Sequence, residues 1–152
     1  MFWQDVLLGW EEGDSALAGA AAAALGVPDQ AVRIVDAVTD GGPNKPPVRL
    51  LIERSLLKGD YPFHLSVYVN DSEVEKGLHQ PGATTDRVIR LCQLLGCFAL
   101  ISDDALSPLS WLRISPAGAI ERVTLDAERL DRDEYVIAVE SPSGARQVPL
   151  AP

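Results

Sequence analysis

The sequence predicts an α+β fold: a mostly antiparallel sheet of about six to seven strands, with two main helices packed on one face. Two segments carry apolar residues at helical spacing, and several others are short and rich in Val, Ile and Leu, as strands are. The helices stand apart from runs of strands, which favours segregated helices over the regular alternation of a parallel sheet. The length of 152 residues predicts one domain over 1–152, with the tail from about 141 partly loose.

The first helix is predicted to have Asp14 or Ser15 as its N-cap and to run to about Leu25. Both Asp and Ser suit an N-cap, and Gly26 with Pro28 beyond it is typical of a helix end. One face of this helix is apolar because residues recur at spacings of three and four: Leu17, Ala20, Ala21, Ala24 and Leu25.

The second helix is predicted over 86–95. Thr84 or Thr85 would cap its first turn, and Gly96 would end it. Its buried stripe is formed by Val88, Leu91, Cys92 and Leu95.

Strands are predicted wherever short apolar or alternating runs lie between turn residues. The apolar segment 2–10 fits either a strand or a short helix, and a turn at 116–118 predicts a hairpin. The loop 40–47 contains three prolines, so strand pairing must stop there. We expect the strands 31–38, 48–54 and 63–70 to form an antiparallel meander. The predicted strands are 31–38, 48–54, 63–70, 97–102, 109–115, 119–125 and 135–140.

Charge limits the choice of partner. The formal net charge is −9, with 22 acidic residues against 13 basic ones, and no basic run offsets this locally. Duplex binding needs Lys and Arg to neutralise several phosphates, so nucleic acid is not expected as a partner. No Lys or Arg precedes Arg33, whereas five acidic residues do. The acidity therefore predicts a basic protein partner, with solubility alone as the alternative explanation.

Candidate binding residues lie where acidic side chains gather. Trp10 beside Glu11 and Glu12 is predicted to be an exposed anchor with an acidic rim, because aromatic side chains are frequent anchors at interfaces. The full set predicted to bind a partner is Trp10, Glu11, Glu12, Asp14, Asp103 and Asp104.

The pair Asp103 and Asp104 follows a predicted buried strand and is open to two interpretations. Paired carboxylates there could bind a divalent cation or act as an acid and a base. The alternative, which we favour, is turn formation, in which an Asp carboxylate accepts hydrogen bonds from nearby backbone N–H groups.

No catalytic, metal or cofactor motif is found in the sequence. A nucleophile elbow of the GxSxG type and glycine-rich phosphate loops are both missing, and His64 and His79 are the only imidazoles. We therefore expect no cofactor, no catalytic residue and no metal. The predicted function is that of a non-enzymatic, acidic, protein-binding domain. The alternative is a small metal-dependent or His/Asp hydrolase that uses His64, Asp103 and Asp104.

The remaining observations concern location. Cys92 and Cys97 are expected to be buried thiols, and such sparse cysteine use fits a reducing cytoplasm. No apolar run approaches the ~20 residues that span a bilayer, and no basic stretch precedes the apolar segment 18–25, so no membrane partner is expected. Ten Arg against three Lys and abundant Ala suggest a bacterial source. The sequence leaves open whether the protein forms a homodimer.

The predicted element order resembles, in outline, that of the acidic chaperones of bacterial secretion systems, although those end in a helix and this chain is predicted to end in strands. In size and charge the chain is similar to small immunity proteins, which cover the often basic active sites of toxins. No motif carries either likeness. Both imply docking onto a protein partner.

Overall fold

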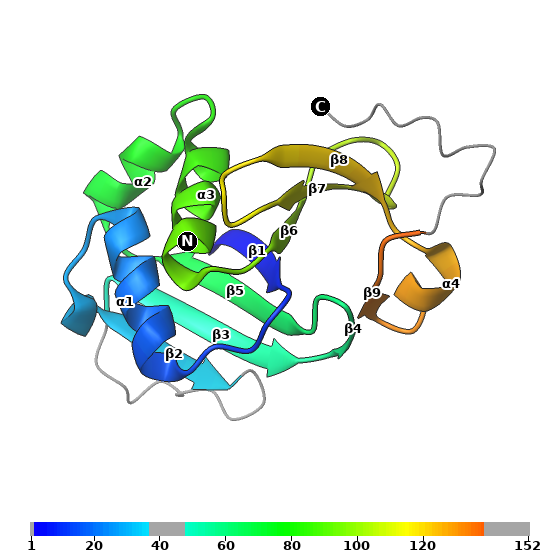
Figure 1. Ribbon diagram of the computed structural model, residues 1–152. Helices are drawn as coiled ribbons and strands as arrows, with labels where there is room; N and C mark the ends of the chain where they lie inside the picture. Colours follow the sequence, from blue (N-terminus) through cyan, green and yellow to red (C-terminus); the bar gives the residue numbers. More distant parts are fainter. Residues whose placement is uncertain (1, 37–47, 139–152) are drawn as a thin grey trace.

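The computed structural model describes residues 2–36 and 48–138 (Figure 1). The predicted loop 40–47 and the tail from 141 lie outside these residues. Seven strands form one sheet in the order β2-β3-β5-β1-β6-β7-β8, and two short strands, β4 and β9, pair separately. The predicted α+β class is confirmed. In chain order the elements are β1 (Phe2–Leu8), α1 (Asp14–Leu25), the 3-10 turn η1 (Asp29–Ala31), β2 (Val32–Asp36), β3 (Leu50–Leu56), β4 (Lys58–Gly59), β5 (Phe63–Val69), α2 (Ser72–Leu78), α3 (Ala83–Leu95), β6 (Ala99–Ser102), β7 (Ser110–Ile114), β8 (Ile120–Thr124), α4 (Ala127–Leu130) and β9 (Glu134–Tyr135).

The segment that could have been helix or strand is the central strand of the sheet. β1 pairs antiparallel with β5, where Val6 lies opposite Leu65, and with β6, where Leu7 lies opposite Leu100. Val6, Leu7 and Leu8 are all buried. Both faces of β1 are therefore covered at its C-terminal end, which explains why Val6–Leu8 form an apolar run there instead of an alternation.

The predicted antiparallel meander is wrong for its first pair of strands. β2 and β3 run parallel, with Val32 opposite Leu50, whereas β3 and β5 are antiparallel as expected. A parallel pair needs a crossover connection of a dozen or more residues. The thirteen residues 37–49 between the two strands provide that length. The length of a loop alone does not show whether the next strand runs parallel or antiparallel to the first.

The two long helices, α1 and α3, pack against each other and against one face of the main sheet (Figure 1). Alternate side chains of β5, such as Leu65 and Val67, point into this layer. Both helices end as predicted, at Gly26 and Gly96, each in the left-handed conformation that glycine adopts without a steric penalty. Their N-caps differ from the prediction of Asp14 or Ser15 and of Thr84 or Thr85. Gly13 and Gly82 occupy the N-cap positions, and neither cap uses a side chain.

The opposite face of the sheet is covered in part by the C-terminal end of the described chain. Leu7 and Leu100 pack there with Leu125 and Tyr135, and Trp111 contacts the Tyr135 ring edge-on at 5.5 Å. The predicted strand 135–140 is reduced to β9, and residues 139 and 140 lie outside the described chain. The remaining part of this face, on β3 and β5, carries polar side chains.

Candidate functional site

The loop 9–13, between β1 and α1, carries three of the six predicted binding residues, and a fourth, Asp14, is the first residue of α1. Its start is fixed by the backbone N–H of Gly9, which donates to the carbonyl oxygen of Phe98 at 2.9 Å. Its end is fixed by the first turn of α1, where the N–H of Leu17 donates to the carbonyl oxygen of Gly13. Trp10 is 68% exposed between these two anchors, whereas Trp3 and Trp111 are half-buried. The structure exposes Trp10 as the sequence predicts.

The first residues of this loop, Gly9 and Trp10, line a cavity of about 490 Å³, here called the aromatic cavity. Its walls come from the residues just after β1, just before β6 and just before β5, from β7 and from Ile137. Two of its side chains, Trp10 and Phe98, are among the exposed large hydrophobic residues. The side chains that line the aromatic cavity include Trp10, Asp60, Tyr61, Cys97, Phe98 and Arg113.

The one cation of the aromatic cavity, Arg113, is already compensated by an acid of this chain. The guanidinium of Arg113 pairs with Glu121 and lies over the ring of Phe98, 5.2 Å from its centroid. Burial raises the pKa of Tyr61, and a hydrogen bond with Arg113 only partly opposes this. Tyr61 is therefore neutral, and the cavity presents aromatic walls to a ligand in place of an unpaired cation.

The later residues of the loop, Glu11, Glu12 and Gly13, line a second cavity of about 470 Å³, here called the acidic cavity. Arg54 from β3 pairs with Asp14 at the start of α1, and its Nε donates to Asp36 Oδ1 at 2.9 Å. Leu56, 58% exposed, gives this cavity an apolar rim. The side chains that line the acidic cavity include Glu11, Glu12, Asp14, Asp36, Arg54 and Leu56.

Carboxylates outnumber guanidiniums around the two cavities. Five acidic residues and two arginines line them, and both arginines are engaged by acids of this chain. Among the described residues, Glu11, Glu12 and Asp60 form no direct ion pair. Asp14, by contrast, is held by Arg54. The surface around the loop is thus acidic and contains exposed apolar side chains.

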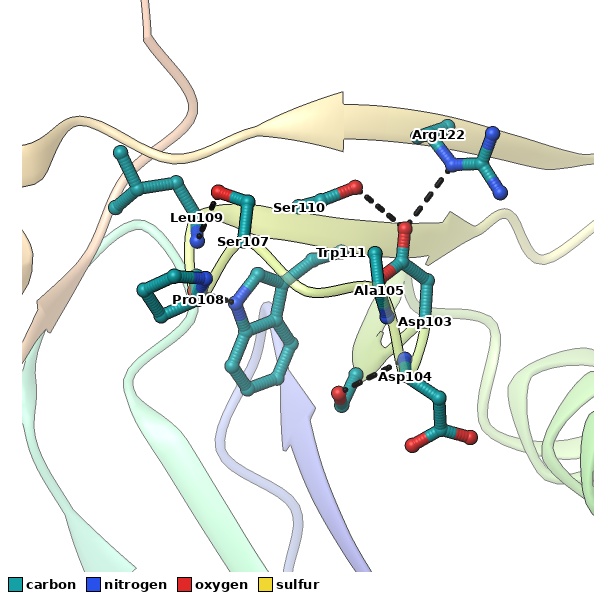
Figure 2. Close-up of polar contacts among 10 residues, drawn as sticks. Asp103, Asp104, Ala105, Ser107, Pro108, Leu109, Ser110, Trp111 and Arg122 are labelled. Carbon is teal, nitrogen blue, oxygen red and sulfur yellow. Dashed lines mark hydrogen bonds and ion pairs between the residues drawn. The ribbon is translucent and has the colours of Figure 1, made fainter.

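The other two predicted binding residues, Asp103 and Asp104, lie on the loop after β6, where Asp103 is held by hydrogen bonds within the chain (Figure 2). The carboxylate of Asp103 accepts hydrogen bonds from the N–H of Ala105 at 2.9 Å, from Arg122 Nε at 3.0 Å and from the hydroxyl of Ser110. Its side chain is only 1% exposed. Burial alone would raise the pKa of Asp103, but these hydrogen bonds outweigh burial and lower it. Asp103 thus stabilises a turn, as the favoured interpretation had it.

Asp104 is exposed, and its carboxylate points away from Ser110 and Arg122 (Figure 2). Its backbone has a φ of 61°, and its N–H donates to Ser102 Oγ at 3.2 Å. β6 runs antiparallel to β1, so the loop after β6 lies by the beginning of β1, and the loop with Trp10 lies beyond its end. At ~3.3 Å per residue, on the order of 15–20 Å of strand separates them. The structure does not bring the two acidic groups together.

His64 contacts a different aspartate from the one expected for a hydrolase. Its Nε2 lies 3.0 Å from Asp5 Oδ1, which also accepts from Ser66 Oγ at 2.7 Å, and its Nδ1 lies 3.5 Å from Ser55 Oγ. These residues share the polar half of a sheet face. A Ser–His–Asp set acts in acyl transfer together with preorganised oxyanion donors. Here β5 is paired on both sides, by β3 and β1, so its backbone N–H groups are engaged in strand pairing.

The two cysteines are buried, as predicted, and are free thiols. Burial raises the pKa of Cys92 to about 12, with a contribution from Cys97. Burial together with nearby Glu12 raises the pKa of Cys97 to about 11. Both therefore remain protonated at neutral pH and are poor nucleophiles or metal ligands.

In 2–36 and 48–138, no three His, Cys, Asp or Glu side chains gather in a way that could hold a metal ion. Within the same part of the chain, every helix is too short or too polar to cross a membrane.

Aromatic-cavity residues Tyr61, Phe98 and Arg113 were not identified from the sequence. They come from three separate elements, and no local pattern marks them as neighbours of Trp10. Comparison with protein-family models, with curated proteins and with solved structures finds no match to this chain.

Proposed function

We propose that this protein is a non-enzymatic binding domain that docks a basic protein partner through the loop 9–13 and the two cavities beside it. The observation that carries the proposal is the position of Trp10: an exposed indole between an aromatic cavity and two carboxylates, Glu11 and Glu12, that no basic group of the described chain pairs with directly. Interfaces combine exposed aromatic anchors with a polar rim in this way.

Charge complementarity supports a basic partner. The whole chain carries a formal net charge of −9, and the surface around the loop has more carboxylates than guanidiniums. A partner with the opposite charge would be steered to this surface, which raises the association rate more than the lifetime of the complex. The immunity-type or secretion-chaperone-like roles suggested by size and charge fit within this proposal. A bacterial source and a cytoplasmic location, which two free thiols fit, belong to the same proposal.

A hydrolase has weaker support. His64, Asp5 and Ser55 form a chain of polar contacts, but His64 and Asp5 lie on the flat face of the sheet with side chains 30% and 49% exposed. Such a place neither excludes water nor offers oxyanion donors. We interpret this group as cross-strand hydrogen bonding that satisfies polar side chains on a half-covered sheet.

The test of the proposed function is the association rate of a captured partner. A partner obtained from a lysate of the source organism by crosslinking is identified by mass spectrometry, purified and bound to the full chain at low and high salt. The E11K/E12K variant is expected to associate about tenfold more slowly or worse and to lose most of the salt dependence. Asp14 is left unchanged, because its substitution would also break its ion pair with Arg54.

The matched control is E73K/E75K, which changes the net charge equally. These residues lie on α2, which follows β5 at the opposite end of the sheet from the loop 9–13. This control should associate almost as fast as the wild type. A partner that binds E11K/E12K as fast as the wild type, with the same salt dependence, overturns the proposal.

A further inference from the structure

We propose, resting on the function above, that the partner is recognised through one short segment in which an apolar side chain and a Lys or Arg lie about two to four residues apart. The apolar side chain occupies the aromatic cavity, and the basic side chain pairs with Glu11 and Glu12.

The aromatic cavity suits an apolar side chain. Trp10 and Phe98 are exposed on its walls, and Tyr61 is neutral. Its one guanidinium, from Arg113, is paired with Glu121 and stacked on Phe98. An anionic ligand would have to compete with Glu121, whereas an apolar ligand needs only to displace water. The volume of about 490 Å³ lies within the usual range of ligand pockets, which gives room for an aromatic side chain.

The acidic cavity suits a basic side chain, because it already holds one from this chain, that of Arg54. Arg54 lies between two carboxylates, those of Asp14 and Asp36. Glu11 and Glu12 line the same cavity and form no ion pair with a described residue. A second guanidinium or ammonium, supplied by the partner, would complete the charge balance there.

The spacing between the two recognised side chains follows from the distance between Trp10 and Glu12 on the loop 9–13. Trp10 and Glu12 are two residues apart, so their Cα atoms are separated by at most about 7 Å. Two side chains on the same side of an extended segment are also about 7 Å apart, and those three or four positions apart on a helix are about 5–6 Å apart. One short segment of a partner can therefore reach the aromatic wall and the carboxylates together.

The experiment is a selection of random dodecapeptides displayed on phage against the full chain. Enriched peptides are expected to combine an aromatic or aliphatic residue with Lys or Arg at the stated spacing. Synthetic copies should bind W10A at least about tenfold more weakly, as expected when an interface anchor is truncated. They should bind E11Q/E12Q more weakly and with less salt dependence.

Two matched controls show whether the effect is local. L106A removes a fully exposed apolar side chain on the loop after β6, and E73Q/E75Q removes two acids on α2; both should bind the peptides as the wild type does. Peptides without a basic residue, peptides that bind W10A equally well, or no enrichment at all would each overturn the inference.

Two further outcomes separate this inference from the proposed function. A captured protein partner that needs Glu11 and Glu12 but is unaffected by W10A overturns the two-point recognition and leaves the basic-partner proposal in place. Light scattering tests the other occupant of this surface: a dimer that W10A dissociates would place a second copy of the chain there and overturn the inference. We expect W10A to leave the molar mass unchanged.

Discussion

The two acidic loops of this protein, 9–13 after β1 and 103–109 after β6, use carboxylates in opposite ways. In the first loop, Glu11 and Glu12 form no direct ion pair with a described residue and stand beside an exposed Trp10. In the second loop, the carboxylate of Asp103 is buried and accepts three hydrogen bonds. Both loops leave the end of a sheet strand, and both carry two adjacent acids.

The difference teaches that the path of the chain after the acids decides their role. After Asp103 the chain turns back into β7, which brings Ser110 and Arg122 of the hairpin within reach of the carboxylate. After Glu12 the chain enters α1 and leaves the sheet, so no hairpin returns to meet the side chain. Four predictions test this contrast.

The largest effect is expected for D103A. The substitution leaves the Ala105 N–H, the Ser110 hydroxyl and the Arg122 guanidinium without their acceptor. We expect the free energy of unfolding to fall by about 2–3 kcal/mol, measured by urea denaturation followed by circular dichroism. D29A, which removes an exposed acid, is the control. A loss below about 0.5 kcal/mol for D103A would show that this turn does not depend on the carboxylate.

The next effect concerns the backbone of Asp104. Its φ of 61° is tolerated by Asp but strained for a β-branched residue, so D104V should lower the free energy of unfolding by about 1–2 kcal/mol. D104G accepts the same conformation and should change it by less than about 0.5 kcal/mol. Equal stabilities of the two variants in the same denaturation assay would show that the left-handed conformation is not required.

A smaller effect is expected from pH. The pKa of Asp103 is lowered in the folded protein below its usual 3.8, so the unfolded chain takes up this proton first as the pH falls. The stabilisation is therefore complete above the unfolded pKa and is lost as the pH falls through the folded pKa.

Denaturation curves recorded from about pH 6 down to about pH 3 should show a steeper loss of stability for the wild type than for D103N, because the amide cannot titrate. The pKa of other paired acids, such as Glu134 beside Arg129, is also lowered, and the comparison of the two proteins cancels their contribution. Parallel curves would contradict the role given to Asp103.

The smallest effect on stability is expected for E11Q/E12Q. Neither carboxylate is ion-paired to a described residue, so the free energy of unfolding should change by less than about 0.5 kcal/mol. The change should be neutral or slightly stabilising, because the substitution reduces self-repulsion in a chain of net charge −9. A loss of more than about 1 kcal/mol would show that these acids act in folding instead of binding.

Local features of the fold could be predicted, and long-range ones could not. The hairpin of β7 and β8 was predicted from the turn at 116–118 and is confirmed, with Ser115 N–H bonded to Ala119 at 2.9 Å. The helix ends at Gly26 and Gly96 were predicted for the same reason, since a glycine in the left-handed conformation acts within one turn.

One local feature was overlooked. α2 begins after Asp71, whose carboxylate accepts from the N–H groups of Glu73 at 2.9 Å and Val74 at 3.1 Å. An N-cap Asp with acids in the first turn is a sequence pattern for a helix start. The segment 72–78 could therefore have been predicted as a helix from the residues alone.

For the candidate site, the sequence by itself determined the acidic character of the chain, the absence of a basic residue before Arg33 and the adjacency of Trp10 with Glu11 and Glu12. These depend only on neighbouring residues. The tertiary structure decided the central position of β1, the parallel pairing of β2 with β3, the burial of Asp103 and the approach of Phe98, Tyr61 and Arg113 to Trp10. Each of these depends on contacts between distant segments, whose pairing is chosen by the packing of the whole core and not by local preference.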